Sequence, residues 1–311
     1  MNRCMVCCEP LAAGEESYHP ACSRRLFGNR TPARVPYSWD ELNALAENIV
    51  QRHVAVPGVQ PKLSLHLEKR GMGPGRFTLV GLEGEFILKP PAKDYPGMPE
   101  LEHLCMRLAT GAGLDVATCG LTPLASGEIA YITRRMDRVD GRALHMEDLC
   151  QLTDRMTEEK YRASMEQVGR AVRTYSNNPG LDALRLFELT LFCFVTGNSD
   201  MHLKNFSLIR DADGLIHMSP AYDLLPTQLF LPEDREEIAL TLNGRKNRLH
   251  RRDFDAFGKS LELTDRQVLT VYLKLAQWVD SADLTIEKSF ASAKQQDAFK
   301  GLIKERASRL E

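Results

Sequence analysis

One short segment carries two polar side chains at a spacing that suits phosphoryl transfer. Asp200 is followed after four residues by Asn205, in the run GNSDMHLKNFSL that begins at Gly197. A carboxylate in such a loop can orient an incoming hydroxyl and accept its proton, and an amide oxygen can bind Mg²⁺ beside the phosphates. The spacing therefore predicts Asp200 as a catalytic base and Asn205 as a magnesium ligand.

A second metal-binding carboxylate is expected after a strand pair. Residues 208–210 and 215–218 flank the turn sequence DADG, which predicts a hairpin that leads to Asp223. The alternative is that Asp200 and Asn205 only cap a turn and that Asp223 caps a helix. The order of the three residues, with an apolar helix ahead and a hairpin between, favours chemistry.

A lysine ends the apolar run FILKP. This residue, Lys89, can bind the α- and β-phosphates of a nucleotide when a helix glutamate pairs with it. Glu102 is the natural partner, and Glu100 competes for the same role. A surface lysine with a buried stem is the alternative.

The elements that must carry these residues fall into two groups. Ser38 and Glu41 predict a helix N-terminus, with the helix continuing to about Gln51. Strand-like runs follow at residues 62–67, 77–80, 85–89 and 128–133, interrupted by one helix from Pro99 to Gly111. The second group is helical, with helices predicted at residues 161–175, 181–196, 263–279 and 285–309.

This order predicts an α+β fold with two lobes, in the outline of a protein kinase. We expect a Cys/His-rich head at residues 1–30, a strand-rich N-lobe with one helix at 31–138 and a mainly helical C-lobe at 139–311.

Composition is that of a globular protein without a membrane segment. Of 311 residues, 43% are hydrophobic and 26% charged, and the formal net charge is −2, so direct DNA binding by this chain alone is not expected. Neither a membrane-length apolar run nor a signal-peptide-like stretch occurs, which predicts a cytoplasmic protein.

The head contains four soft metal ligands in two pairs, Cys4-x-x-Cys7 and His19-x-x-Cys22. These spacings fit a small structural zinc knuckle. Cys8 could replace Cys7 in the set. The alternative is a reduced head without metal, whose cysteines pack in the core.

The motifs together resemble the HipA-like kinase family, the toxins of bacterial toxin–antitoxin modules. The resemblance covers nearly the whole chain from about residue 38. Its motifs are GVQPKLS at 58–64, FILKP at 86–90, EHLCM at 102–106, RRMDR at 134–138, NSDMHLKNFS at 198–207, PAYD at 220–223 and LTLNG at 240–244.

The resemblance implies a serine/threonine kinase with ATP between two lobes and the adenine against residues 133–137. Lys89 would bind phosphate, Asp200 would be the base, and His202 and Lys204 would support the loop. Magnesium would be held by Asn205 and Asp223. The remaining ATP-binding residues implied are Gly58, Val59, Gln60, Lys62, Glu102, Arg134, Met136 and Asp137.

Family substrates are aminoacyl-tRNA synthetases. The implied partner is a HipB-like helix-turn-helix antitoxin, with DNA contacted only through it. Only about 50 residues precede Gly58, as in the short HipT type of the HipBST system, which adds a small HipS-like protein as partner. The loop at residues 53–58 lacks the serine that relatives autophosphorylate. Two rival functions are a kinase of small molecules and an ATP-binding pseudokinase or scaffold.

Overall fold

A computed structural model of the chain describes residues 2–52, 61–68, 75–80, 83–139 and 141–311. These residues divide into two units, and the division falls within one helix. Unit 1 comprises residues 1–104, 117–135 and 288–291, and unit 2 comprises residues 105–116, 136–287 and 292–311. Residues 1–30 therefore lie within unit 1.

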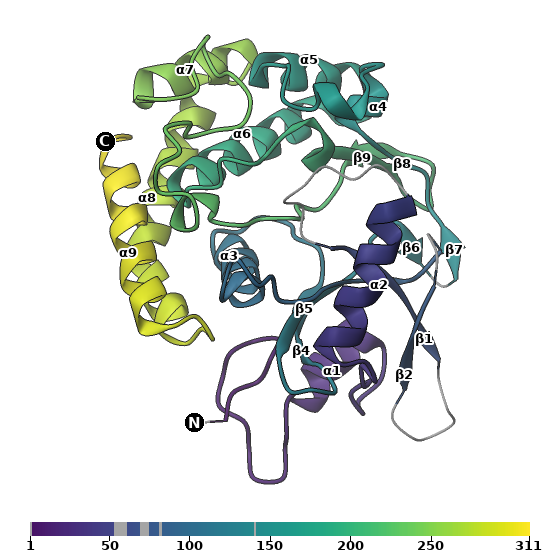
Figure 1. Cartoon of the computed structure of the whole chain (residues 1–311). Helices are drawn as coiled ribbons and strands as arrows, with labels where there is room; N and C mark the ends of the chain where they lie inside the picture. Colours follow the sequence, from purple (N-terminus) through teal and green to yellow (C-terminus); the bar gives the residue numbers. More distant parts are fainter. Residues whose placement is uncertain (1, 53–60, 69–74, 81–82, 140) are drawn as a thin grey trace. The chain divides into compact units, whose positions relative to one another are not determined.

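Unit 1 is built on an antiparallel sheet in the order β2-β1-β3-β5-β4. Figure 1 labels β1, β2, β4 and β5 of this sheet. Its strands are β1 (Leu63–Glu68), β2 (Arg76–Leu79), β3 (Phe86–Lys89), β4 (Cys119–Pro123) and β5 (Ile129–Arg134). The alternation in LSLHLE buries Leu63, Leu65 and Leu67 on one face of β1, as a half-exposed strand requires.

The helices of unit 1 are α1 (Pro20–Phe27), α2 (Trp39–Arg52) and the first turns of α3 (Met98–Gly111). The rings of Phe27, Phe77 and Phe86 pack against one another, so α1 shares its core with the sheet. Cys4 and Val6 belong to the same core. The N-terminal residues are thus part of the packing of unit 1.

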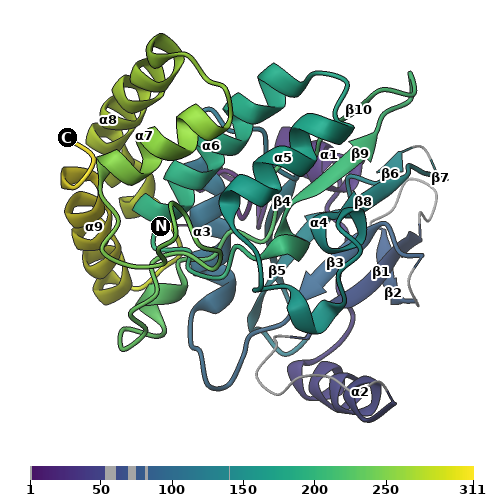
Figure 2. The same cartoon turned by 90° about the horizontal axis from the view of Figure 1, so that it is seen from above.

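Unit 2 is centred on α6 (Pro179–Val195), which is buried along most of its length. The four longer helices that pack against it, seen from above in Figure 2, are α5 (Met165–Tyr175), α7 (Arg251–Ser260), α8 (Asp265–Glu287) and α9 (Ala293–Ser308). The apolar sequence LRLFELTLFCFV explains the position of α6, because a helix that is hydrophobic on all sides must be surrounded.

Smaller elements of unit 2 support the polar loop that follows α6. An antiparallel sheet in the order β10-β9-β8 contains β8 (Met146–Asp148), β9 (Ser207–Arg210) and β10 (Ile216–Met218). The remaining short elements are β6 (Arg138–Val139), β7 (Arg142–Ala143), α4 (Leu149–Leu152) and the 3₁₀ turns η1 (Thr157–Glu159), η2 (Leu203–Asn205) and η3 (Thr227–Leu229).

Most predicted elements are confirmed, including the hairpin before Asp223 and the Ser38–Glu41 capping interaction. The predicted helix start at Tyr161 is wrong. Ser164 and Gln167 form a reciprocal capping box, which starts α5 at Met165. The predicted start of the last helix at residue 285 is also wrong, because α8 continues to Glu287.

Strand β4 was not predicted. Its sequence CGLTP combines glycine and proline with no alternation of polar and apolar residues, and its pairing with β5 supplies the order that the local sequence lacks. No helix among the described residues combines the length and hydropathy needed to cross a bilayer.

Candidate active site

Unit 1 contains a buried ion pair at the end of strand β3. The Lys89 Nζ lies 2.5 Å from Glu102 Oε1, with 4% of Lys89 and none of Glu102 exposed. The Lys89 ammonium also lies 5.4 Å from the centre of the Tyr131 ring. Glu102, rather than Glu100, is the partner, because residues two apart point to different sides of a helix. The alternative that Lys89 is a surface lysine with a buried stem is therefore wrong.

The other nucleotide-binding residues expected in unit 1 are spread along its sheet. Lys62 is exposed directly before β1, and Arg134 ends β5, where its N–H donates to the Thr118 carbonyl at 2.8 Å. Gly58, Val59 and Gln60 lie outside the described residues.

In unit 2, helix α6 ends in a left-handed turn that starts the polar loop. Gly197 has φ 67°, a left-handed conformation that favours glycine, and a Cβ at this position would lie 2.5 Å from Leu302 Cδ2 and displace that side chain. Three residues later, Asp200 is exposed. Its carbonyl accepts from the His202 N–H at 2.8 Å, and its own N–H donates to Asn198 Oδ1 at 3.1 Å.

Asn205 is held in a defined orientation beside Asp200. Its Nδ2 donates to the Asp200 carbonyl at 3.1 Å, and only 7% of the residue is exposed. This bond fixes which side of the amide carries oxygen, and no described residue donates a hydrogen bond to that Oδ1. The oxygen is therefore available to a hard cation.

Asp223 is attached to the same loop through the residue before it. The Tyr222 hydroxyl donates to the Lys204 carbonyl at 2.9 Å, so the 2.6 Å contact with Ser207 Oγ must have the serine as donor. Asp223 itself has φ 60°, a left-handed conformation that costs energy for a residue other than glycine. Such strain is characteristic of functional positions.

His202 is enclosed in the loop and lies within electrostatic range of both carboxylates. Burial lowers the pKa of His202 to about 4, although the charges of Asp200 and Asp223 act to raise it. Its imidazole is therefore neutral at pH 7. His202 Nδ1 and Asn198 Nδ2 are buried without a hydrogen-bond partner among the described residues, which is unusual unless a ligand or water completes the loop.

Lys204 is directed to a carboxylate within unit 2. Its Nζ lies 2.6 Å from Asp148 Oδ2, and Asp148 also caps helix α4. Met136 is half-buried at the start of this unit, and the Asp137 carboxylate pairs with Arg138 at 2.7 Å. Asp148 was not singled out from the sequence, since nothing local indicates that it meets Lys204.

Tyr161 is a further residue that the sequence did not indicate. Its hydroxyl donates to Asp200 Oδ1 at 2.6 Å, and its ring meets His202 edge-on with centroids 5.1 Å apart. Burial, followed by the bond to Asp200, raises the pKa of Tyr161, so the hydroxyl keeps its proton. The Leu203 N–H donates to the Lys160 carbonyl at 3.1 Å, which holds this segment against the loop.

The donor set fits Mg²⁺. Asn205 contributes an amide oxygen and Asp223 a carboxylate, which are the hard oxygen ligands that this ion prefers. Asn205 lies in the loop after α6 and Asp223 in the segment after β10, and the bond from the Tyr222 hydroxyl to the Lys204 carbonyl links these two segments.

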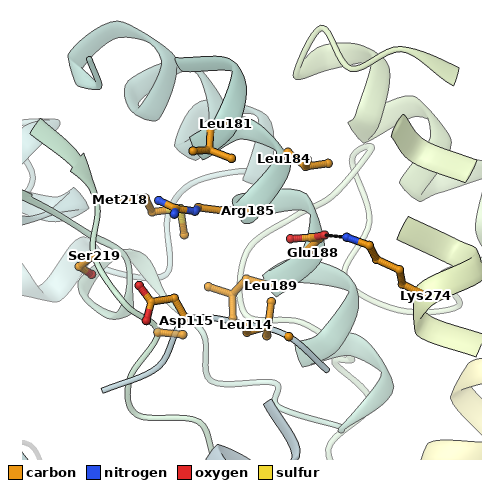
Figure 3. Close-up of a pocket in the computed structure, with 12 residues that line it drawn as sticks. Leu114, Asp115, Leu181, Leu184, Arg185, Glu188, Leu189, Met218, Ser219 and Lys274 are labelled. Atoms are coloured by element: carbon orange, nitrogen blue, oxygen red, sulfur yellow. Dashed lines mark ion pairs between the residues drawn. The ribbon is translucent and has the colours of Figure 1, made fainter. Parts of the chain in front are cut away.

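A cavity of about 250 Å³ lies within unit 2, lined in part by Met218, Ser219 and Ala221 ahead of Asp223 (Figure 3). Asp115, Arg185 and Ser219 line it, and the ion pair between Glu188 and Lys274, 3.5 Å apart, closes one side. The Ala221 N–H donates to the Asp115 carbonyl at 2.8 Å, so this wall supports the chain two residues before Asp223. Neither Asp200 nor Asn205 lines the cavity.

The four predicted zinc ligands also come together, in unit 1. The sulfur atoms of Cys4, Cys7 and Cys22 and a ring nitrogen of His19 lie within 4.8 Å of one another. Cys8 is not in this set.

Comparison with known proteins assigns the family. The sequence profile described as "HipA-like C-terminal domain" matches residues 54–282, which is more than half of the chain. The chain belongs to this family.

Relatives of this HipA-like chain carry kinase names. A Haemophilus influenzae protein named a predicted kinase is 26% identical over 304 residues, covering 86% of this chain and 85% of its own length. The Shewanella oneidensis "Serine/threonine-protein kinase toxin HipA" is 27% identical over 255 residues, covering 74% of this chain. This chain spans only 56% of that toxin's length.

Solved structures show the same fold. HipA in a Shewanella oneidensis complex of HipA, HipB and operator DNA superposes with a TM-score of 0.67 at 21% identity, covering 86% of this chain and 70% of that one. The Helicobacter pylori proinflammatory kinase CtkA superposes with a TM-score of 0.55 at 14% identity, covering 78% and 93%. The HipA-like chain therefore has a kinase-like α+β fold.

Proposed function

We propose that this HipA-like chain is a Mg-ATP-dependent serine/threonine protein kinase that acts as the toxin of a toxin–antitoxin module. The observation that carries the proposal is the loop in unit 2. Asp200 and Asn205 share a hydrogen bond there, and Tyr222 attaches the neighbouring Asp223 to the Lys204 carbonyl. The Lys89–Glu102 pair in unit 1 supplies the phosphate-binding lysine of the same chemistry.

Each residue has a defined task in this proposal. Asp200 accepts the proton of a serine or threonine hydroxyl as that oxygen attacks the terminal phosphorus of ATP, and the bond from this phosphorus to the bridging oxygen breaks, so that ADP leaves. The Tyr161 hydroxyl, which donates to Asp200 Oδ1, and the bond from the Asp200 N–H to Asn198 Oδ1 hold Asp200 in place. Lys89 binds the α- and β-phosphates, with Glu102 orienting its ammonium. Asn205 and Asp223 would hold a magnesium ion, which would neutralise phosphate charge when bound.

His202 and Lys204 support the loop without exchanging protons. The neutral imidazole of His202 packs edge-on against the Tyr161 ring and adds no charge beside Asp200. The Lys204 ammonium pairs with Asp148, and the Lys204 carbonyl accepts a hydrogen bond from the Tyr222 hydroxyl. Nucleotide contacts from Lys62, Arg134, Met136 and Asp137, and from residues 58–60, complete the proposal.

Substrate and partners follow from the family resemblance. We assign an aminoacyl-tRNA synthetase as substrate, whose phosphorylation in the cytoplasm stops translation and growth. A HipB-like helix-turn-helix antitoxin is the expected partner, supported by the HipB that accompanies HipA in the Shewanella complex. A small HipS-like protein is the second expected partner, and DNA is contacted through the antitoxin.

The test is label transfer from radiolabelled ATP to purified synthetases. We expect the wild type to label one synthetase and to arrest growth when expressed alone, and Asp200→Ala and Asp223→Gln to do neither. Asp213→Asn is the matched control, because Asp213 is an exposed carboxylate in the turn of the nearby hairpin.

Two outcomes would contradict the proposal. Growth arrest that persists in Asp200→Ala would mean that the toxicity is not phosphoryl transfer. Label transfer to metabolites in a lysate but to no protein would identify a kinase of small molecules instead.

A further inference from the structure

The N-terminal part of unit 1 gathers three thiols and one imidazole at one point. Cys7 Sγ lies 3.3 Å and Cys22 Sγ 3.9 Å from His19 Nδ1, and all four ligand atoms, including Cys4 Sγ, lie within 4.8 Å of one another. Ligands of a tetrahedral zinc ion lie about 3.3–3.8 Å apart, given bonds of about 2.0–2.3 Å. The spacing of this set is therefore close to that of a filled site.

The orientation of His19 is set from its other side. His19 Nε2 lies 3.0 Å from the Pro10 carbonyl oxygen, which can only accept a hydrogen bond. Nε2 therefore carries the proton, and Nδ1 directs its lone pair toward Cys7 and Cys22. A backbone carbonyl bonded to the distal nitrogen is the usual outer-shell support of a metal-bound histidine.

Hydrogen bonds within the head hold Cys4 in place. The His19 N–H donates to the Cys4 sulfur at 3.5 Å. A left-handed residue, Cys8 with φ 63°, closes the turn, and its N–H donates to the Cys4 carbonyl at 2.8 Å. Cys4 is fully buried, so its sulfur is shielded from solvent.

We propose that Cys4, Cys7, His19 and Cys22 bind one structural Zn²⁺ ion. Three sulfurs and one nitrogen form a soft set that suits zinc rather than magnesium or calcium. All four tetrahedral positions are taken by protein ligands, so no position remains for a substrate or a catalytic water. The site is therefore structural.

The segment between Cys4 and Cys7 is hydrogen-bonded to helix α3, which carries Glu102. Val6, between the first two ligands, accepts a hydrogen bond at its carbonyl from His103 Nε2 at 3.1 Å, and His103 is the neighbour of Glu102 in α3. Its flanking residue Met5 accepts from the Leu121 N–H of β4 at 2.8 Å. We infer that the ion stabilises the part of unit 1 that presents Lys89 and Glu102. This second step rests on the proposed kinase function, whereas the metal site does not.

The first experiment measures metal in protein purified from zinc-sufficient medium. We expect one zinc per wild-type chain by elemental analysis, and less than a tenth of that in Cys7→Ser and Cys22→Ser. Cys8→Ser is the matched control, because it removes an adjacent thiol outside the set and should keep the full zinc content. Zinc retained by Cys7→Ser but lost by Cys8→Ser would overturn the ligand assignment.

A second measurement does not depend on the variants folding. Wild-type protein stripped by a chelator is titrated with Co²⁺, and we expect saturation at one equivalent with thiolate charge-transfer and tetrahedral d–d absorption. Absence of these bands together with absence of zinc would overturn the site. So would a disulfide, recognised as fewer than eight titratable thiols in the denatured, unreduced chain.

The functional step is tested last. Zinc removal should lower the melting temperature by about 5 °C or more, given the usual dependence for domains of this size. It should also raise the KM for ATP several-fold, and added zinc should restore both. Full zinc content with no phosphoryl transfer would refute the kinase proposal and leave the metal site standing. Transfer with an unchanged KM after zinc removal would refute the link to Lys89.

Discussion

The two units position charged groups in opposite ways. In unit 1, Lys89 is buried against Glu102, and the pair neutralises itself within the protein. In unit 2, Asp200 is exposed and is held by a tyrosine hydroxyl and by backbone bonds, without a basic partner among the described residues. The comparison teaches that Lys89, which we propose binds phosphate, is also a structural element, whereas Asp200, the proposed base, can be changed at little cost to folding.

The largest effect on stability is expected from breaking the buried pair. Lys89→Met leaves Glu102 charged and buried, which should lower the free energy of unfolding by about 3 kcal/mol, measured by chemical denaturation. Lys93→Met, at an exposed lysine of the same unit, should change it by less than about 0.5 kcal/mol. The double variant Lys89→Met/Glu102→Leu should recover most of the loss. If it is as unstable as Lys89→Met, the uncompensated charge is not the reason.

A second ion pair, in unit 2, tests whether burial rather than location decides the cost. Glu237 accepts from Arg309 Nη1 and Nη2 at 2.8 and 2.9 Å and from the Leu249 N–H at 2.9 Å. Burial alone would raise the pKa of Glu237, but these bonds and the nearby Arg306 outweigh it and lower the pKa from its ordinary value. Glu237→Gln should lower the free energy of unfolding by about 2 kcal/mol at pH 7. The reason is that the guanidinium groups of Arg306 and Arg309 would stay buried or half-buried without the charge of Glu237.

The sign of the pH dependence follows from that lowered pKa. A carboxyl with a depressed folded-state pKa contributes its full stability above its ordinary value and loses it as pH falls through the folded value. The difference between wild type and Glu237→Gln should therefore be constant from pH 5 to 7 and shrink below pH 4.5. A difference that grows on acidification would contradict the assignment of Glu237 as the charged partner.

A smaller effect is expected at Tyr161. Tyr161→Phe removes the bond to Asp200 Oδ1 and should lower kcat about fivefold, the equivalent of one hydrogen bond of about 1 kcal/mol. The KM for ATP should stay the same, since among the described residues the hydroxyl bonds only to Asp200, the proposed base. In an Asp200→Asn background the same change should have no further effect on residual activity. An equal loss in both backgrounds would show that Tyr161 acts on something other than Asp200.

The smallest effect on stability is expected at the base itself. Asp200→Asn should lower the rate of phosphoryl transfer about 10³-fold. It should change the free energy of unfolding by less than about 0.5 kcal/mol. A loss of stability comparable to that of Lys89→Met would break the contrast between the units.

The sequence alone determined most of the helices and strands and the residues that can carry out chemistry. Helix α6 follows from its continuous apolar run, the hairpin from its turn residues, and the Asp200–Asn205 pair from spacing within one loop. These features depend on neighbours within a few residues, so local pattern suffices. The cysteine and histidine pairs of the head were visible for the same reason.

Only the tertiary structure decided which groups meet. Glu102 rather than Glu100 forms the ion pair with Lys89. The Tyr161 hydroxyl donates a hydrogen bond to Asp200, and Asp148 forms an ion pair with Lys204. The last two partners are separated by 39 and 56 residues along the chain, and no local propensity records such distances. The neutral state of His202 was equally invisible, because its pKa is set by burial, and burial exists only once the chain has packed.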